Sequence, residues 1–287
     1  MEVNSILIYG PGQMGNGIAH VMAEQGIKVI LQGRAQSSID KGMKMINDNC
    51  NRAIKKGTLT EEKKAYILSN ITTRVGEEFT KEDCDVDMVM EAIAEDIDLK
   101  KDLFRKWNEL CPERTIFATN TSSLPVTALA AVTSRPHKVV GMHFFSPVFV
   151  MRLVEVINGL ATDDETMQAT IELAKRIGKN PVPVNDYAGF VANRIMCPMM
   201  NEAAQVMFEG VADAETVDAC MLYGFNHPIG PVRLMDAIGL DTMLHVMEIL
   251  HREFGDDKYR PSPLMRKYVE AGWLGKKTGR GFYNDYK

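Results

Sequence analysis

The chain has 287 residues, of which 45% are hydrophobic and 25% charged, and its formal net charge at pH 7 is -5. The length predicts two domains, and the composition is that of an ordinary globular protein. The slightly acidic balance gives no indication of binding to a nucleic acid or to a membrane surface, so we expect neither as a partner.

The N-terminus, the apolar runs and the cysteines together predict a cytoplasmic protein. The opening segment MEVNSILIYG lacks the basic stretch and apolar core of a secretory signal. The longest uncharged run, 115–134, is rich in Thr and Ser and contains Pro125, which argues against a membrane span. The five cysteines are odd in number and far apart, which is typical of free thiols in a reducing compartment.

The first part of the chain predicts a βαβ unit. An apolar run at 5–10 is followed by a helical spacing of apolar residues over 14–25 and by a second apolar run at 28–31. The turn between the first run and the helix has the spacing G-x-G-x-x-G. Its residues are Gly10, Gly12, Gln13, Met14 and Gly15 around Pro11. This pattern predicts a dinucleotide site, because the glycines allow a tight turn and the helix N-terminus attracts the pyrophosphate.

Later apolar runs extend the same pattern. They lie at 86–92, 116–119, 139–142 and 153–157 and alternate with helical or polar stretches. This alternation predicts an α/β fold with a doubly wound, mostly parallel sheet. Thr162 and Glu165 have the spacing of a capping box, which predicts a helix that ends near Gly178.

The last third of the chain predicts helices instead of strands. Helical patterns cover 190–208, a segment near 216–222, and 240–254, and many methionines occur among them. We place the boundary near residue 186, with a dinucleotide-binding domain over 1–186 and an all-α domain over 187–287.

The end of the second apolar run has no carboxylate. Dinucleotide sites for NAD usually have an acidic residue about 20 residues after the glycine turn, where it binds the ribose 2′-hydroxyl. Here the neighbourhood is Gln32, Gly33 and Arg34. Glycine leaves room for a 2′-phosphate and a guanidinium can pair with it, so we expect NADP(H) to be favoured over NAD(H). In the alternative, Arg34 stacks on adenine or points into solvent while NAD(H) binds without its usual acid.

Polar residues follow two of the predicted strands. Asn120 and Ser122 come after the run 116–119, where a ligand of a doubly wound sheet would lie. Capping of a helix over 124–131 explains them equally well. His143 follows the run 139–142, and a histidine in apolar surroundings is often only a core residue.

Glu155 makes the catalytic interpretation of His143 stronger. It lies twelve residues later inside an apolar run, where a carboxylate is costly unless it is paired. A His–Glu pair fixes the tautomer of the imidazole and makes it a general acid and base. The histidines and cysteines lack the spacing of metal ligands, so we expect no metal.

Taken together, these segments resemble the L-3-hydroxyacyl-CoA dehydrogenase family, and within it the bacterial 3-hydroxybutyryl-CoA dehydrogenases. Besides the glycine turn, the resemblance is carried by MEAIAED (90–96), ATNTSSLPVT (118–127), GMHFFSPVFVMRLVEVI (141–157), GFVANR (189–194), NHPIGP (226–231), DAIGLD (236–241) and GWLGKKTGRGFY (272–283). It implies a Rossmann-type domain followed by a helical domain that forms a homodimer.

The resemblance also implies roles for single residues. These are catalysis by His143 oriented by Glu155, substrate contacts from Ser122 and Asn193, cofactor-side contacts from Ser122, Glu95 and Lys100, and a contact of Lys56 with coenzyme A. The chain departs from the family pattern at Gly33, where the family has an aspartate, and at Ser146, where it has an asparagine near the nicotinamide.

The implied reaction is hydride transfer that interconverts acetoacetyl-CoA and (S)-3-hydroxybutyryl-CoA, in a butyrate-type fermentation or in fatty-acid metabolism. Two alternatives stay open. One is a protein that binds a dinucleotide without turnover, as the lens crystallins related to this family do. The other is a dehydrogenase of a free 3-hydroxy acid that is not linked to coenzyme A.

Overall fold

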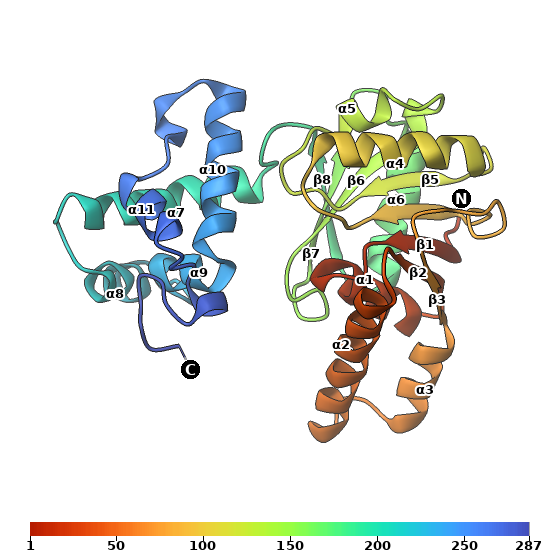
Figure 1. Cartoon of the computed structure of the whole chain (residues 1–287), viewed down its shortest axis with the longest axis horizontal. Coiled ribbons are helices and arrows are strands. Elements are labelled where there is room, and N and C mark those ends of the chain that lie inside the picture. Colours follow the sequence, from red (N-terminus) through yellow and green to blue (C-terminus); the bar gives the residue numbers. More distant parts are fainter. Residues whose placement is uncertain (287) are drawn as a thin grey trace. The chain divides into compact units, whose positions relative to one another are not determined.

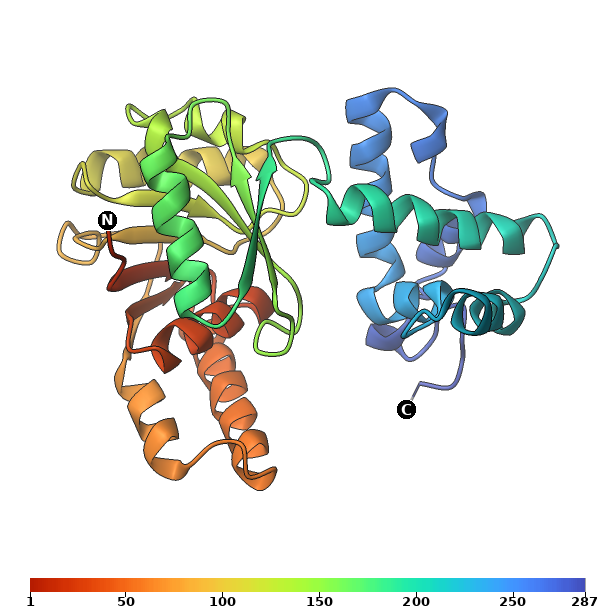
Figure 2. The same ribbon diagram turned by 180° about the vertical axis from the view of Figure 1, so that it is seen from behind.

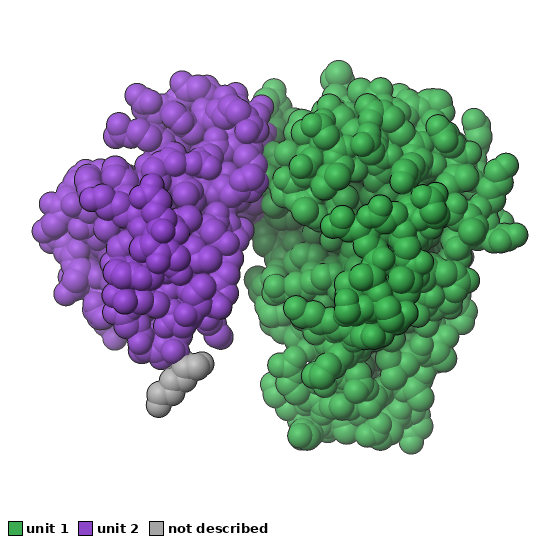
Figure 3. Space-filling model, viewed as in Figure 1, with its two compact units in different colours: residues 1–187 green, residues 188–287 purple. Residues whose placement is uncertain are grey.

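The computed structural model describes residues 1–286 and contains two compact units, Met1–Tyr187 and Ala188–Lys287 (Figure 3). Each unit has its own buried apolar core. The first unit is built on a sheet and the second on helices.

Within the described chain the sheet has eight strands in the order β3-β2-β1-β4-β5-β6-β7-β8 (Figure 1). The strands are β1 Ser5–Tyr9, β2 Lys28–Gly33, β3 Ile71–Val75, β4 Met88–Glu91, β5 Ile116–Thr119, β6 Val139–Phe144, β7 Leu153–Asn158 and β8 Asn180–Asn185. Neighbouring strands are parallel except β6 and β7, which are antiparallel. The predicted doubly wound, mostly parallel α/β fold is confirmed.

Helices cover both faces of this sheet. They are α1 Gln13–Glu24, α2 Gln36–Lys55, α3 Glu61–Ser69, α4 Ile97–Leu110, α5 Val126–Ala130 and α6 Asp164–Arg176. Ile8 of β1 belongs to one face, where it shares a buried cluster with Ile18 of α1 and Leu173 of α6. Phe117 of β5 points to the other face, where its ring packs against Phe104 of α4. Figure 1 shows α4 in front of the sheet, and α6 lies in front in the reverse view of Figure 2.

Two details of the first unit differ from the sequence predictions. Strand β8, which was not predicted, contains Pro181 and Pro183, and it can form because it pairs only with β7 at the sheet edge. The prediction of a capping box at Thr162 is wrong. The N-cap of α6 is Asp163, whose carboxylate accepts a hydrogen bond from Thr166 N at 2.7 Å. Thr162 instead donates to the carbonyl of Val139 at 2.6 Å.

The second unit is helical, as predicted. Its α-helices are α7 Ala192–Phe208, α8 Ala214–Phe225, α9 Pro231–Ile238, α10 Leu240–Phe254 and α11 Pro263–Glu270. The chain also has short 3₁₀ turns at Pro136–Lys138, Asp257–Tyr259 and Lys276–Thr278. Helix α7 begins after Phe190 because that residue has a φ of 49°. Buried methionines fill this core, among them Met200, Met235, Met243, Met247 and Met265. No helix in the described part of the chain is both long and apolar enough to cross a bilayer.

Candidate active site

The glycine turn follows the carboxyl end of β1. Gly10 has a φ of +110°, and a β-carbon there would lie 2.4 Å from the carbonyl oxygen of Ala92. A β-carbon on Gly15 would lie 1.8 Å from the carbonyl oxygen of Gly10, whereas one on Gly12 would meet no atom within 4 Å. Gly10 and Gly15 are therefore required by the packing of the turn. Gly12 leaves open space over it.

The N-terminus of α1 is available to an anion. Gly12 is its N-cap and offers no side chain, and the first turn contains no acidic residue. Gly12 and Gln13 are exposed, while Met14 is half-buried. Backbone N–H groups at an uncapped helix start, with the helix dipole behind them, suit a phosphate. This end of the sheet therefore fits the pyrophosphate of a dinucleotide.

Gly33, at the end of β2, lies against the same turn. A β-carbon at this position would lie 2.7 Å from Cγ of Pro11 and 3.0 Å from Oγ of Ser38. The ring of Pro11 thus occupies the space that a larger residue at position 33 would need. The side chain of Arg34 is 72% exposed, and its Nε lies 3.5 Å from Oε1 of Glu77, a residue that the sequence did not single out.

Glu95 connects the end of β4 to the loop after β5. Its Oε1 accepts hydrogen bonds from Ser122 N at 2.8 Å and Ser123 N at 3.1 Å, and from the hydroxyl of Thr121. Burial raises the pKa of Glu95. The positive charge of Lys100 and, after it, the hydrogen bonds from Thr121 and Ser122 lower this pKa by more, so it lies below its ordinary value. Glu95 therefore stays ionised while it holds the Ser122 loop in place.

Lys100 lies beneath this loop and is almost completely buried. Its Nζ is 2.7 Å from Oε1 of Glu91 and 3.0 Å from Oε2 of Glu95. Burial lowers the pKa of Lys100, yet Glu91 and then Glu95 raise it more, and the net pKa is raised. Glu91 also accepts a hydrogen bond from the hydroxyl of Thr119 and one from Ile93 N at 3.2 Å. Glu91 was not predicted as a site residue, although a carboxylate inside the apolar run at 86–92 was a usable signal.

The loop after β5 does not cap α5. The carboxylate of Asp186 accepts hydrogen bonds from Val126 N at 3.1 Å and Thr127 N at 2.7 Å at the start of that helix. Asn120 instead accepts a hydrogen bond from Phe144 N at 3.0 Å and so connects the ends of β5 and β6. The N-cap of α5 is Pro125, which has no side-chain cap, so Asn120 and Ser122 do not cap this helix. Between them, the hydroxyl of Thr121 accepts a hydrogen bond from Leu124 N at 2.9 Å, at the start of the predicted segment.

His143 and Glu155 face each other across the antiparallel pair β6–β7. They are register partners, and His143 Nδ1 lies 2.8 Å from Glu155 Oε2. Both side chains are buried, and the ring of Phe145 lies 4.5 Å from the imidazole, measured between centroids. A carboxylate at Nδ1 favours the tautomer that carries its hydrogen there, which leaves Nε2 with a lone pair. This geometry suits a general acid and base.

Ser146 lies next to the glycine turn. Gln13 Nε2 donates a hydrogen bond of 2.7 Å to its hydroxyl, and the peptide bond from Ser146 to Pro147 is cis. The structure thus brings Gln13 and Ser146 together, and it brings Ser122, Glu95 and Lys100 together. Lys56 is exposed at the end of α2, and Asn193 lies in the first turn of α7. Among residues 1–286 no cluster of His, Cys, Asp and Glu could hold a metal.

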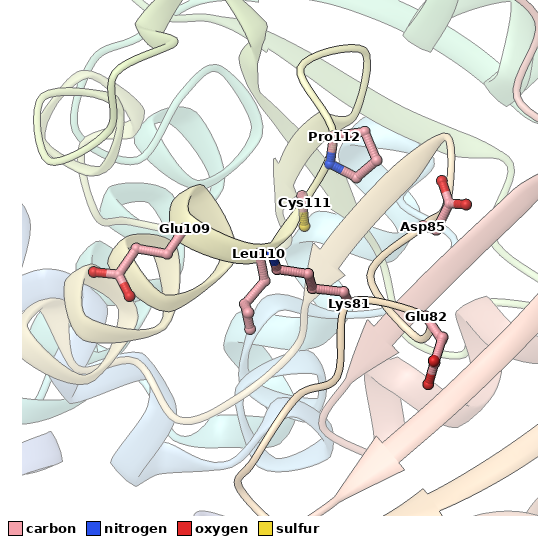
Figure 4. A pocket seen from close by; sticks show the side chains of 7 residues that line it. All are labelled: Lys81, Glu82, Asp85, Glu109, Leu110, Cys111 and Pro112. Carbon is pink, nitrogen blue, oxygen red and sulfur yellow. The ribbon is translucent and has the colours of Figure 1, made fainter.

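A pocket of about 410 Å³ lies at the other end of the strands (Figure 4). It is lined by Lys81, Glu82, Asp85, Glu109, Leu110, Cys111 and Pro112. Asp85 precedes the start of β4 and Pro112 precedes the start of β5, whereas the glycine turn and Ser122 follow the ends of strands. This pocket is therefore separate from the candidate site.

Comparison with known proteins gives a full-length match. The model of the 3-hydroxyacyl-CoA dehydrogenase NAD binding domain matches residues 5–187, and that of the C-terminal domain matches residues 189–285. A protein of Bacillus subtilis named "Probable 3-hydroxybutyryl-CoA dehydrogenase" is 49% identical over 288 residues, which cover 100% of this chain and 99% of the relative. A 3-hydroxybutyryl-CoA dehydrogenase of Clostridioides difficile is 46% identical over 97% of this chain and 98% of its own length.

The solved structures agree with the sequence comparisons. The crystal structure of an (S)-3-hydroxybutyryl-CoA dehydrogenase from Ralstonia eutropha matches with a TM-score of 0.94 and 47% identity, and the match covers 100% of both chains. A structure from Mycobacterium tuberculosis matches with a TM-score of 0.95 and 36% identity over 99% of both chains.

Proposed function

Because the chain belongs to the 3-hydroxyacyl-CoA dehydrogenase family and is an oxidoreductase, we propose that it interconverts acetoacetyl-CoA and (S)-3-hydroxybutyryl-CoA. The observation that carries this proposal is the buried pair of His143 and Glu155, with 2.8 Å between Nδ1 and Oε2. The pair sits on two strands of the unit that contains the glycine turn, as the acid and base of a dehydrogenase would.

The chemistry assigned to these residues is proton transfer. A bound nicotinamide supplies or accepts the hydride at C3 of the acyl chain. In reduction His143 gives its Nε2 proton to the 3-oxygen, and in oxidation it removes that proton. The Glu155 carboxylate stabilises the imidazolium and keeps Nε2 directed at the substrate. Ser122, together with Asn193 from the family motif GFVANR, positions the substrate oxygen.

The same proposal assigns the cofactor contacts. Gly12, Gln13 and Met14 surround the start of α1, which would bind the pyrophosphate. Glu95 orients the Ser122 loop and Lys100 in turn fixes Glu95, so Lys100 acts through Glu95. Ser146, held by Gln13, takes the place of the family asparagine beside the nicotinamide.

We propose NADP(H) as the preferred cofactor. No carboxylate stands at position 33, and the exposed guanidinium of Arg34 follows it. A guanidinium binds a phosphate through charge-assisted hydrogen bonds, whereas the ribose 2′-hydroxyl of NAD(H) offers it no negative charge.

The substrate is a coenzyme A thioester, and we assign Lys56 to a phosphate of coenzyme A. The second unit, matched by the C-terminal domain of the family, is proposed to form a homodimer. The two alternatives, a protein without turnover and a dehydrogenase of free 3-hydroxy acids, lack support from the full-length similarity to 3-hydroxybutyryl-CoA dehydrogenases.

One assay tests the activity, the requirement for a coenzyme A thioester and the cofactor preference. Acetoacetyl-CoA and free acetoacetate are each offered to the purified chain with NADPH and with NADH, and oxidation of the cofactor is followed by absorbance. We expect turnover with acetoacetyl-CoA only, and a higher kcat/KM for NADPH. Absence of turnover with both cofactors would refute the activity. A higher kcat/KM for NADH would refute only the cofactor preference.

A further inference from the structure

The loop after β3 is fastened to the end of β2. Gly76 N donates a hydrogen bond of 2.9 Å to the carbonyl of Gly33. The buried amide of Gln32 donates to the carbonyl of Gly76 at 3.1 Å and to that of Glu78 at 2.8 Å. Three hydrogen bonds therefore fix the backbone on both sides of Glu77. They hold this residue next to the place where the ribose of a dinucleotide would lie.

The Glu77 carboxylate points to Arg34 from this loop. Its Oε1 lies 3.5 Å from Arg34 Nε, and the two side chains are 57% and 72% exposed. Both charges also act on Tyr9, the last residue of β1: burial and Glu77 raise the pKa of the phenol, and Arg34 opposes them. Arg34 follows the carboxyl end of β2 and Glu77 follows that of β3, so the pair lies at the same edge of the sheet as the glycine turn after β1.

We propose that Glu77 is a specificity residue that limits the preference for NADP(H) by competing with the 2′-phosphate for Arg34. This inference rests on the proposed binding of the 2′-phosphate by Arg34. To bind Arg34, a 2′-phosphate must displace the Glu77 carboxylate from the guanidinium. It is then repelled by that carboxylate, because both groups are negatively charged. The 2′-hydroxyl of NAD(H) is neutral and does neither, so Glu77 weakens the binding of one cofactor only.

The size of the effect follows from the exposure of the pair. Water screens charges at such a position strongly, and exposed ion pairs contribute little. We expect removal of the Glu77 charge to tighten NADPH binding by roughly twofold to fivefold. The effect should shrink at high salt, because exposed charges are screened.

The test is a direct titration of the purified chain with NADPH and with NADH, which gives a Kd for each. Glu77→Gln removes the charge at constant size, and Glu77→Lys reverses it. Glu78→Gln is the matched control, because it removes an equal charge from the adjacent exposed residue. We expect the Kd for NADPH to fall in Glu77→Gln and further in Glu77→Lys. The Kd for NADH should change less than about twofold, and Glu78→Gln should resemble the wild type.

Two results would overturn the inference. An unchanged Kd for NADPH in both Glu77 variants would show that the carboxylate does not compete. A weaker binding of NADH with unchanged NADPH would show that Glu77 accepts the ribose hydroxyl instead. Because the readout is binding, the inference is tested even in a chain without turnover. A wild type that binds NADH more tightly than NADPH would contradict the proposed cofactor preference. The change in the Kd for NADPH between the wild type and the Glu77 variants would still test the role of Glu77.

Discussion

Glu155 Oε2 lies 2.8 Å from His143 Nδ1, and the two residues are direct partners in the antiparallel register of β6 and β7. The backbone ladder thus sets the distance between imidazole and carboxylate. Since both side chains are buried, neither can turn toward water without disturbing the sheet. The pair is preorganised, as a general acid and base should be.

The first prediction concerns His143. We expect His143→Gln to lower kcat for acetoacetyl-CoA reduction by about a thousandfold, because the amide cannot transfer the proton. The circular dichroism spectrum should stay that of the wild type. His137→Gln, an exposed histidine just before β6, is the control and should keep wild-type activity. A His143→Gln enzyme that keeps half of the wild-type rate would contradict the assignment.

The second prediction separates the role of Glu155 from that of His143. Glu155→Gln keeps the size of the side chain and can still accept the hydrogen from Nδ1, but it no longer offers a charge to the imidazolium. We expect kcat to fall roughly tenfold to a hundredfold, which is less than for His143→Gln. A Glu155→Gln enzyme that keeps the wild-type kcat would contradict the role assigned to the carboxylate.

The third prediction concerns the buried lysine. Lys100→Met would leave Glu91 charged and without its cation in the core, at a cost of about 3–5 kcal/mol in the free energy of unfolding. Glu91→Gln in addition should recover a large part of this loss. Urea unfolding of the wild type, the two single variants and the double variant forms the double-mutant cycle that measures this coupling. Strictly additive effects would show that the two charges do not stabilise each other.

Local patterns predicted the elements that short segments specify. The glycine turn between β1 and α1 follows from the spacing of Gly10, Gly12 and Gly15 and from the flanking apolar runs. The pairing of Glu155 with His143 was also predictable, because a carboxylate in an apolar strand needs a partner. The same argument applied to Glu91, but its partner Lys100 lies on a helix, where a lysine is usually exposed.

Features that depend on contacts between distant segments were not predictable. Pro181 and Pro183 speak against a strand until the topology shows that β8 is an edge. From the sequence, Gly33 was expected to leave room for a 2′-phosphate. In the structure, the ring of Pro11 occupies the space beside its α-carbon. The position of Glu77 beside Arg34 depends on hydrogen bonds of Gln32 to a loop more than 40 residues away, as the separations of 44 and 46 residues show.

The fourth prediction concerns acid stability. The net pKa of Glu95 in the folded chain lies below its ordinary value of 4.5. Its ionised form therefore stabilises the fold at pH values above 4.5, and this contribution is lost as the pH falls through the folded pKa. We expect wild type to be more stable than Glu95→Gln near neutral pH and the difference to shrink below pH 4.5. Urea unfolding of both proteins without cofactor across this range gives the two curves. A difference that is independent of pH would contradict the prediction.

The last prediction concerns the exchange of cofactor preference at Gly33. Gly33→Asp alone should destabilise the chain by about 1–3 kcal/mol, because its β-carbon would lie 2.7 Å from Cγ of Pro11. Pro11→Ala removes that ring. In Pro11→Ala/Gly33→Asp we therefore expect stability to return toward that of the wild type. Urea unfolding of the wild type, both single variants and the double variant measures these differences. A single Gly33→Asp variant as stable as the wild type would show that Pro11 does not restrict this position.

In the double variant the new carboxylate can accept a hydrogen bond from the ribose 2′-hydroxyl and repels a 2′-phosphate. We expect the ratio of kcat/KM for NADH to that for NADPH to rise about tenfold to a hundredfold, which corresponds to one hydrogen bond to a charged group. Pro11→Ala alone is the control and should keep the wild-type ratio, because it changes the packing and adds no charge. A double variant that folds normally and keeps the wild-type ratio would show that position 33 does not determine the cofactor.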